Sequence, residues 1–380
     1  MKQRQIFTLI LMVNLAVSLP TGISHGDSPG GMGVEVLVSH EGGHVFEISK
    51  GQGSKVVKEF NERARQKIRL VGFGSMSLDQ LRTNLRTVGS DVLFDLGNNQ
   101  ELRIVGVSSQ IVSSIQIKLD RSGLVPTFVD DFDVLSLDLE NEVGQAKGTW
   151  RTNFGYGGVH SRTLVNNGEL QVYADRLFNG TAKSSLNLDP FRIANGNLEI
   201  VAEPLKEDMR QFTWGRSYSS GLLTSKGSFS QTYGVFEIRA KMPLGKGLWP
   251  AFWLLPAHTS SPPELDILEI LGDNPQKLYV SWHSNVGGTH SWETKPINVP
   301  DTSTEFHTYS VDWTKDTINW FFDDIQVASK PTPEDFHQPM YMLLNLAVGG
   351  NWPGAPDTNT EFPAKYSIDW VRVYAQRNPQ

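Results

Sequence analysis

Residues 126–376 contain one short β-like segment after another, and this pattern constrains the fold more than any other feature of the chain. The segments are rich in β-branched and aromatic side chains, and Gly, Pro, Asn and Asp separate them. The pattern predicts an all-β fold, a β-sandwich jelly roll, and about 250 residues fit one such domain. The segments are VFEIRAKM, ELDILEIL, KLYVSWHS, TYSVDW, TINWFF, YMLLNLAV and YSIDWVRVYA.

Residues 27–125 have a different character, because all ten tryptophans of the chain lie at or after Trp150. Short β-like runs in this region predict a small, mostly β accessory domain. Asn98-Asn99 between two of these runs indicates a hairpin turn. Residues 78–89 have helical spacing and end in Gly, which predicts a helix. We place the boundary with the following domain at residues 125 and 126.

Residues 1–26 are expected to be a signal peptide. A positively charged start precedes an apolar stretch of 15 residues, Ile6 to Pro20, which is short for a membrane span. An uncleaved anchor is the alternative. Either interpretation predicts a protein that works outside the cytoplasm, extracellular or periplasmic, and after cleavage we expect no membrane association.

The composition excludes several classes of function. The chain has no cysteine, which excludes disulfides, thiolate catalysis and thiolate zinc sites. The formal net charge is −7 and no cluster of Lys or Arg stands out, so we expect no nucleic-acid partner. We expect a monomer whose stability comes from packing.

The segment Glu264-Leu265-Asp266-Ile267-Leu268-Glu269 is the most informative part of the sequence. Successive side chains of a strand alternate between faces, so Glu264 and Asp266 share one face while Leu265 points into the core. Strict alternation would put Leu268 beside the acids. Glu269 rejoins their face only if one residue bulges out of the strand.

Three neighbouring carboxylates repel one another, which no stability requirement explains. The arrangement suits a site that holds one carboxylate ionised and another protonated at the same pH. With one residue absorbed in a bulge, the two glutamate carboxyls can approach to roughly 5–6 Å, near the separation in retaining glycosidases. Taken alone, an acidic face on a strand is also common without any catalytic role.

Aromatic and polar residues around this strand favour a sugar-binding interpretation, because indole rings stack on the apolar faces of sugars. Most of these residues also have an alternative, purely structural interpretation. Trp249 and Trp253 either line a cleft or pack in the core, and His283 either binds sugar and tunes a pKa or is structural. Trp352 is expected at the edge of a cleft. Asn345 either binds ligand or satisfies a buried group.

The region from Asp130 to Tyr374 resembles the laminarinase-like members of glycoside hydrolase family 16. The matching segments are SKGSFSQTYGVFEIRAKMPLGKGLWPAFWLLP, ELDILEILG, LNLAVGGNWPG and IDWVRVY, in the order typical of the family. The resemblance implies a jelly roll with a substrate cleft across a concave sheet. It also implies that Glu264 is the nucleophile, Glu269 the acid/base, and Asp266 the residue that sets their protonation.

Two further acids enter through the same resemblance. Asp369 matches a position that often binds a structural calcium in the family, with Asp131 as its expected partner, and oxygen ligands suit calcium. The alternative is that both are ordinary surface acids. No cofactor is required for the expected chemistry.

Residues 27–125 resemble the segment that closes β-roll arrays in secreted RTX-type proteins. The resemblance rests on GHVFEISKGQG, VKEFN and GSDVLFDLGNNQELRIVGV. The calcium-binding nonapeptide repeats are absent, and Ser54-Lys55 follow GQG where an Asp would be expected. We therefore expect no calcium in this region.

The expected function is that of a secreted endo-acting hydrolase that cleaves a β-1,3- or mixed β-1,3/1,4-glucan with retention. A bacterial exopolysaccharide of the succinoglycan type is an alternative substrate. A second alternative is a non-catalytic glycan-binding protein on the same fold, although such members typically lack one or both glutamates. Transglycosylation differs from hydrolysis only in the acceptor.

Overall fold

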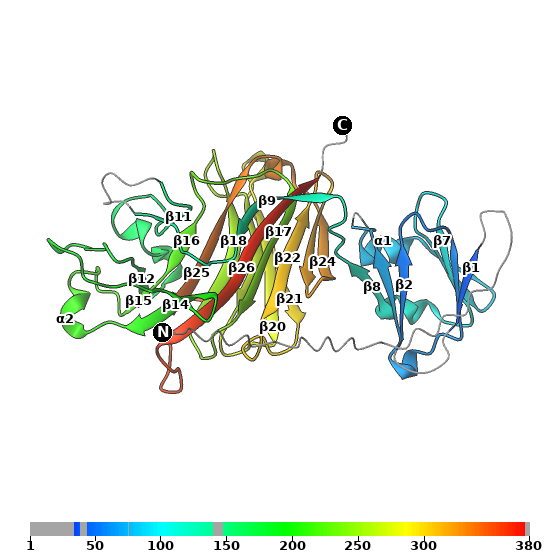
Figure 1. The fold of residues 1–380 in the computed structure, drawn as a ribbon, viewed down its shortest axis with the longest axis horizontal. Coiled ribbons are helices and arrows are strands. Elements are labelled where there is room, and N and C mark those ends of the chain that lie inside the picture. The colour runs from blue at the N-terminus through cyan, green and yellow to red at the C-terminus, as the bar shows by residue number, and fades with distance from the viewer. Residues whose placement is uncertain (1–33, 39–43, 75, 140–146, 377–380) are drawn as a thin grey trace, which may run out of the picture. The chain divides into compact units, whose positions relative to one another are not determined.

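The computed structural model describes residues 34–38, 44–74, 76–139 and 147–376 (Figure 1). The expected signal peptide lies outside these residues. The chain divides into two compact units. The first comprises residues 1–46, 51–67 and 84–114, and the second comprises residues 47–50, 68–83 and 115–380. None of the helices in the described ranges is both long and apolar enough to cross a membrane.

The inner sheet of the second unit contains the carboxylate strand. Its strand order is β10-β11-β16-β25-β18-β19-β20-β21. Apart from the parallel pair β10 and β11, its neighbouring strands are antiparallel. The bounds are β10 Leu137–Asp138, β11 Trp150–Arg151, β16 Leu222–Thr224, β18 Leu248–Pro256, β19 Glu264–Ile270, β20 Lys277–Ser284, β21 Ser291–Asn298 and β25 Met340–Val348.

The outer sheet faces the inner one across the core. Its path is β12-β15-β14-β26-β17-β22-β23-β24-β8-β4-β2, with β13 beside β14 and β9 beside β26. The last three strands of this path are β8 Ile115–Lys118, β4 Lys67–Val71 and β2 Val45–Ser49. The bounds are β9 Leu124–Asp130, β12 Gln171–Tyr173, β13 Phe191–Ala194, β14 Asn197–Pro204, β15 Tyr218–Ser220, β17 Gly234–Lys241, β22 His307–Trp313, β23 Thr317–Phe322, β24 Ile325–Pro331 and β26 Ala364–Gln376. This two-layer arrangement is the expected β-sandwich.

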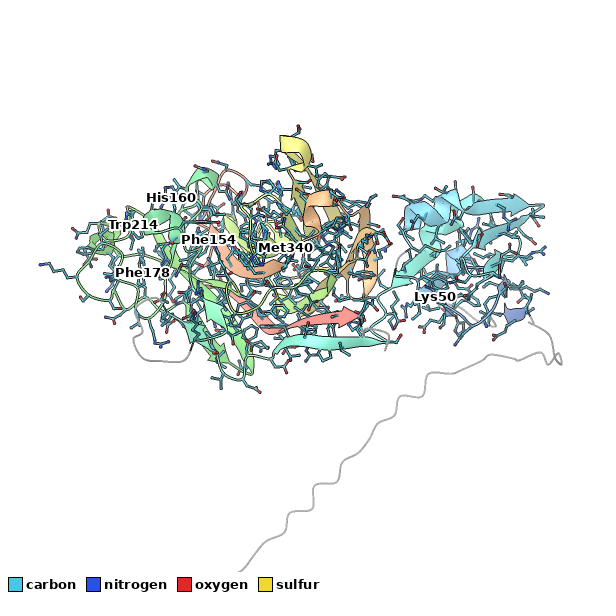
Figure 2. The ribbon with its side chains drawn as sticks, turned by 90° about the horizontal axis from the view of Figure 1, so that it is seen from above. Lys50, Phe154, His160, Phe178, Trp214 and Met340 are labelled. Atoms are coloured by element: carbon cyan, nitrogen blue, oxygen red, sulfur yellow. The ribbon has the colours of Figure 1, made fainter. Side chains whose placement is uncertain are left out.

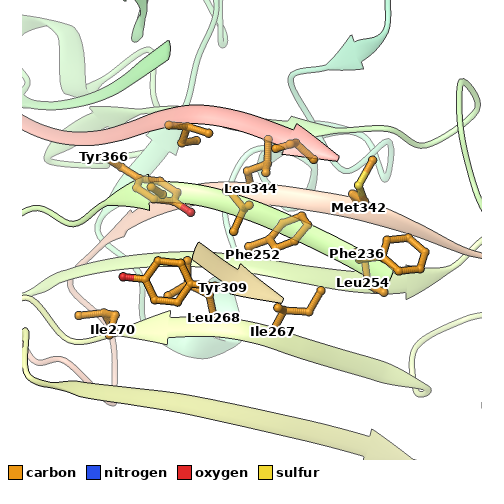
Figure 3. Close-up of a cluster of buried hydrophobic side chains, with 14 of the residues drawn as sticks. Phe236, Phe252, Leu254, Ile267, Leu268, Ile270, Tyr309, Met342, Leu344 and Tyr366 are labelled. Carbon is orange, nitrogen blue, oxygen red and sulfur yellow. The ribbon is translucent and has the colours of Figure 1, made fainter. Parts of the chain in front are cut away.

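Side chains from both sheets form one apolar core. Figure 3 shows Phe252, Leu254 and Leu268 of the inner sheet together with Phe236 and Tyr309 of the outer sheet, and all of them are fully buried. Burying one such side chain stabilises the fold by about 1.5–3 kcal/mol. The alternation of each strand therefore fixes which residues face the core and which face outward.

Strand β25 is buried along its whole length, although it belongs to an antiparallel sheet. It lies between β16 and β18, away from the ends of the sheet. Leu344 and Leu346 point into the core, while Leu343 belongs to a separate cluster with Trp253 and Tyr173 on the other face. Both faces of β25 are therefore covered, which explains its nearly continuous apolar sequence.

Segments between β11 and β15 form a loop-rich region with a small apolar cluster of its own. Phe178, Val172 and Leu205 are buried there, and Trp214 packs against Phe178 with ring centroids 6.1 Å apart (Figure 2). Helix α2 (Glu207–Arg210) and the short 3-10 helices η3 (Gly158–Ser161) and η4 (Val165–Asn167) belong to this region. It contributes residues to the cleft described below.

The first unit has a mixed sheet with the order β1-β3-β7-β6-β5, in which β1 pairs with β3 and β3 with β7 in parallel. The strands are β1 Glu35–Val38, β3 Lys55–Lys58, β5 Leu85–Val88, β6 Asp91–Asp95 and β7 Glu101–Ile104. Between β6 and β7, Asn98 and Asn99 have φ of 53° and 60°, which confirms the turn.

The helix expected over residues 78–89 is wrong in its second half. The structure has α1 at Leu78–Thr83, and Leu85–Val88 form β5, which pairs with β6. Pairing with a neighbouring strand supplies hydrogen bonds that the sequence spacing alone could not reveal.

The second unit also includes Arg121, whose guanidinium pairs with the buried carboxylate of Glu237.

Candidate active site

The three acids of β19 lie on the same side of the inner sheet, and a β-bulge makes this possible. The register with β18 shifts between Phe252 and Trp253, and the register with β20 shifts between Asp266 and Glu269. Ile267 and Leu268 are both buried in the main core. Glu269 therefore returns to the face of Glu264 and Asp266 through the bulge that the break in alternation indicates.

Glu269 is held by two hydrogen-bond donors. Trp249 Nε1 donates to Oε1 over 3.1 Å, and Ser281 Oγ donates to Oε2 over 3.1 Å. The side chain is 9% exposed. Burial and the nearby Glu264 carboxylate raise the pKa of Glu269 to about 7, while the two donors oppose that rise.

Glu264 is more accessible than Glu269, with 26% of its side chain exposed. Ser261 Oγ donates a hydrogen bond to its Oε2 over 3.1 Å. Burial raises the pKa of Glu264 to about 7, and this donor opposes the rise. Ser261 lies in the segment that leads into β19, so the sequence around the first glutamate also supplies its partner.

Asp266 lies between the two glutamates and is 4% exposed. Its burial and the charges of Glu264 and Glu269 raise its pKa well above the ordinary value. Trp320 Nε1 donates to the backbone oxygen of Asp266 over 2.9 Å, which anchors the strand from the core side. Three acids this close in a buried site cannot all be ionised at neutral pH, so they share at least one proton.

His283 lies on β20 opposite Glu264. Its Nε2 is 3.8 Å from Glu264 Oε1 and 3.7 Å from Asp266 Oδ2. Its Nδ1 contacts His290 Nε2 at 3.2 Å, and the rings of His290 and Trp292 stack nearly parallel to it. Burial and the neighbouring His290 lower the pKa of His283, so its neutral form is favoured.

Trp249 and Trp352 form an aromatic wall near Glu269. Their rings meet edge to face with centroids 5.4 Å apart, and Tyr279 meets Trp352 at 4.8 Å. Trp352 is 40% exposed, so its ring is available to a sugar. Both tryptophans line the cleft described below, and sugar binding by them stays a prediction.

Trp253 and Asn345 also line the cleft but are engaged with the protein. Trp253 is 7% exposed, and its Nε1 donates to Asn345 Oδ1 over 2.8 Å. Asn345 Nδ2 donates to the hydroxyl of Tyr173 over 3.0 Å. Of the two alternatives for Asn345, the structure therefore favours the satisfaction of buried groups, in the floor of the cleft.

The cleft has a volume of about 440 Å³ and crosses the inner sheet from β25 to β21. The sequence did not identify several of its residues, most of which come from loops or from the edge strand β21, while a few lie on the central strands β18, β20 and β25. Trp292 on β21 is 60% exposed, and Glu169 is buried with a pKa raised mainly by burial. The missed lining residues are Phe154, Tyr156, Leu164, Asn167, Glu169, Ala251, Leu255, Ser261, Ser281, Trp292, Thr294 and Ala347.

Asp131 and Asp369 do not fit the calcium site expected of them. Asp131 accepts from Arg372 Nη2 over 2.9 Å, and Asp369 is paired with Arg239. These arginines neutralise the charge that calcium would need. Within the described ranges, the one group of three or more acidic or histidine side chains close enough to share a metal is Glu264, Asp266 and His283.

A β-sandwich with an acid pair on one strand and aromatic walls around it defines a glycoside hydrolase. The family model for glycosyl hydrolases family 16 matches residues 185–372. The endo-1,3-1,4-beta-glycanase EglC of Rhizobium meliloti is 37% identical over 332 residues, which cover 87% of this chain and 69% of EglC. The chain belongs to glycoside hydrolase family 16.

Other relatives agree with this assignment. The endo-1,3-1,4-beta-glycanase ExsH of the same organism is 38% identical over 85% of this chain and 67% of its own length. The laminarinase catalytic domain of Thermotoga maritima superposes with a TM-score of 0.53 at 30% identity, covering 67% of this chain and 99% of that domain. The laminarinase of Rhodothermus marinus gives 0.52 at 32% identity, covering 67% and 98%.

Proposed function

We propose that the chain is an endo-β-glucanase that hydrolyses internal bonds of β-1,3- or mixed β-1,3/1,4-glucans with retention of configuration. The observation that supports this most is the position of Glu264 and Glu269 on one face of β19, inside a cleft lined by aromatic rings. The similarity to enzymes named laminarinases and endo-1,3-1,4-beta-glycanases supports the substrate class.

In the first step, the ionised carboxylate of Glu264 attacks the anomeric carbon. Glu269 gives its proton to the glycosidic oxygen, the bond between that oxygen and the anomeric carbon breaks, and the shortened chain leaves. The product is a glycosyl ester on Glu264. The raised pKa of Glu269 suits this step, because it keeps the acid protonated near neutral pH.

In the second step, Glu269 acts as the base. Esterification removes the charge of Glu264, which is one cause of the raised pKa of Glu269. The pKa of Glu269 therefore falls in the intermediate, and the donors Trp249 and Ser281 then stabilise its ionised form. Glu269 takes a proton from water, the resulting oxygen attacks the anomeric carbon, and Glu264 leaves as a carboxylate.

Asp266 is proposed to hold a proton next to the nucleophile. Its pKa is raised by burial and by both glutamates, so the protonated form is favoured. A protonated Asp266 can donate a hydrogen bond to the Glu264 carboxylate, which already accepts one from the hydroxyl of Ser261. This bond keeps Glu264 ionised while Glu269 is protonated.

The localisation, the oligomeric state and the relationship of residues 27–125 to other proteins are proposed mainly from the sequence. We propose secretion on the strength of the leader-like residues 1–26, and a monomer without a required cofactor, since two glutamates and water complete the reaction. The relationship of residues 27–125 to RTX-type β-roll closing segments is also a proposal. Parallel pairing of β1 with β3 and of β3 with β7 supports it.

A second candidate substrate is a bacterial exopolysaccharide. The glycanases EglC and ExsH match 87% and 85% of this chain, whereas the superposed laminarinases cover 67%. Similarity therefore extends beyond the catalytic region in the glycanases. A purely glycan-binding role is disfavoured because both glutamates and their hydrogen-bond donors are present.

Azide rescue tests the roles of the glutamates. Azide replaces the lost nucleophile in Glu264→Ala and yields an α-glycosyl azide from an aryl β-laminaribioside. In Glu269→Ala the glycosyl ester still forms, and azide yields the β-glycosyl azide. The opposite pair of products would reverse the assignment, and full activity of either variant without azide would refute the mechanism.

A second experiment identifies the substrate: reducing-sugar release is measured on laminarin, lichenan and a succinoglycan-type polysaccharide.

A further inference from the structure

A recess of about 360 Å³ lies beside the catalytic cleft and contains a lysine that the proposed reaction does not use. Lys226, Ala257, His258 and Tyr341 are among the residues that line it. Tyr341 packs with Trp253 and Leu255 of the cleft floor, and it lies close enough to Glu264 for that charge to raise its pKa. The recess therefore borders the catalytic centre.

Lys226 is positioned at the boundary between the cleft and the recess. Its Nζ lies 5.2 Å from the ring centroid of Tyr156, which lines the cleft, and 5.6 Å from that of Tyr341. It also donates to the backbone oxygen of Phe154, another cleft residue, over 3.4 Å. These contacts hold the ammonium group in place while leaving two of its N–H donors for a ligand.

The charge of Lys226 has no carboxylate partner among the described residues, and none of the described residues that line the recess is acidic. A second cation lies close by: the guanidinium of Arg151 packs beside Gly227, and its own partner is Asp138 at 3.0 Å. A half-buried ammonium without a counter-ion, next to a sugar cleft, suits an anionic group on the ligand.

We propose that this recess binds an anionic substituent of the polysaccharide, a carboxylate or an ester sulfate, through the ammonium group of Lys226. The proposal rests on the proposed function, since it places a substituted glycan in the catalytic cleft. A neutral glucan would leave the recess filled with water. The recess thus makes the enzyme favour chains that carry acidic decorations near the bond to be cleaved.

Binding to chemically modified lichenan tests the proposal. Three probes are made from one stock: lichenan, partly succinylated lichenan and partly sulfated lichenan, the last two matched in degree of substitution. Affinity is measured in the inactive Glu264→Gln background, so the result does not depend on turnover. We expect at least one anionic probe to bind about tenfold more tightly than lichenan, and 0.5 M salt to reduce this preference.

Variants separate recognition from folding. Lys226→Met is expected to abolish the preference, Lys226→Arg to retain it, and Lys315→Met, an exposed lysine on the turn between β22 and β23, to leave it unchanged. Equal affinity for all probes, or an equal loss of neutral and anionic binding in Lys226→Met, would overturn the proposal. A wild-type protein that cleaves no β-glucan refutes the proposed function instead, and the binding comparison still decides the role of Lys226.

Discussion

The indole Nε1 of Trp249 donates a hydrogen bond to Oε1 of Glu269, and the same ring meets Trp352 edge to face. One side chain therefore joins the proposed acid/base to the exposed aromatic wall of the cleft. Under the proposed mechanism, a sugar that stacks on Trp352 would lie near the carboxyl group of Glu269. The electrostatics of Glu269 and the positioning of the substrate are thus coupled through Trp249.

Replacing Trp249 by Phe should move the alkaline limb of the pH profile to higher pH. The N–H of Trp249 stabilises the ionised form of Glu269. Its removal therefore raises the pKa of Glu269 further. Measuring kcat/KM across pH tests this. Trp253→Phe is the matched control, because its N–H goes to Asn345 and not to an acid. An unshifted limb in Trp249→Phe would show that the bond does not tune Glu269.

Glu269→Gln should abolish turnover and stabilise the folded protein above pH 7. The folded-state pKa of Glu269, about 7, exceeds its unfolded value, so folding loses stability as pH rises from about 4.5 to 7. Glutamine removes this loss of about 1–3 kcal/mol and keeps an acceptor for Trp249.

Thermal unfolding at pH 8 and pH 4.5 checks this expectation. The gain in Tm should be present at pH 8 and shrink at pH 4.5, where the folded protein is protonated at Glu269 and the loss of stability has only begun. Glu305→Gln, at an exposed position, provides the comparison and should change little at either pH. A variant less stable than wild type at pH 8 would contradict the inferred burial penalty.

Deleting Leu268 should remove the bulge without turning Glu269 away from the cleft. With one residue fewer, simple alternation puts all three acids on the same face. The lost core leucine costs about 2–5 kcal/mol, and Leu268→Ala, which keeps the bulge, is the control for that cost. We expect a folded deletion variant with more activity than Glu269→Gln, and a crystal structure shows the carboxylate positions. An inactive variant with Glu269 in the core would refute the role of alternation.

Arg121→Met should destabilise the second unit by about 3 kcal/mol, because it leaves the buried carboxylate of Glu237 without its cation. Urea unfolding measures the loss. The double variant Arg121→Met/Glu237→Gln should recover most of it, since no unpaired charge remains. A variant beginning at residue 126 lacks the same arginine, and we expect it to be less stable than one beginning at residue 115.

The strands of the sandwich were readable from the sequence because one face of each is apolar. The segments around VFEIRAKM, KLYVSWHS and TINWFF coincide with β17, β20 and β23 to within a residue or so. The bulge in β19 was also predictable, since Glu269 violates the alternation that Glu264 and Asp266 begin. Local patterning contains this information, because it records which face meets the core.

The rest of the site depends on contacts that the linear pattern does not encode. Trp292 reaches the cleft only because β21 pairs with β20, and Tyr156 and Glu169 come from irregular segments. Asn345 could not be assigned in advance, since its two partners, Trp253 and Tyr173, lie far from it in sequence. The arginines that pair with Asp131 and Asp369 could not be identified without the fold either, and calcium binding by these two acids stays a prediction.

Strand β21 ends the inner sheet, and most of its side chains are exposed. Trp292 therefore stands on an edge strand that has a neighbour, β20, on one side only. New loops or an added strand can be accommodated there during evolution without repacking the sandwich or disturbing the acids on β19. Divergence in the length and shape of glycan that such enzymes accept would then accumulate at this border, while the chemistry stays fixed at the centre.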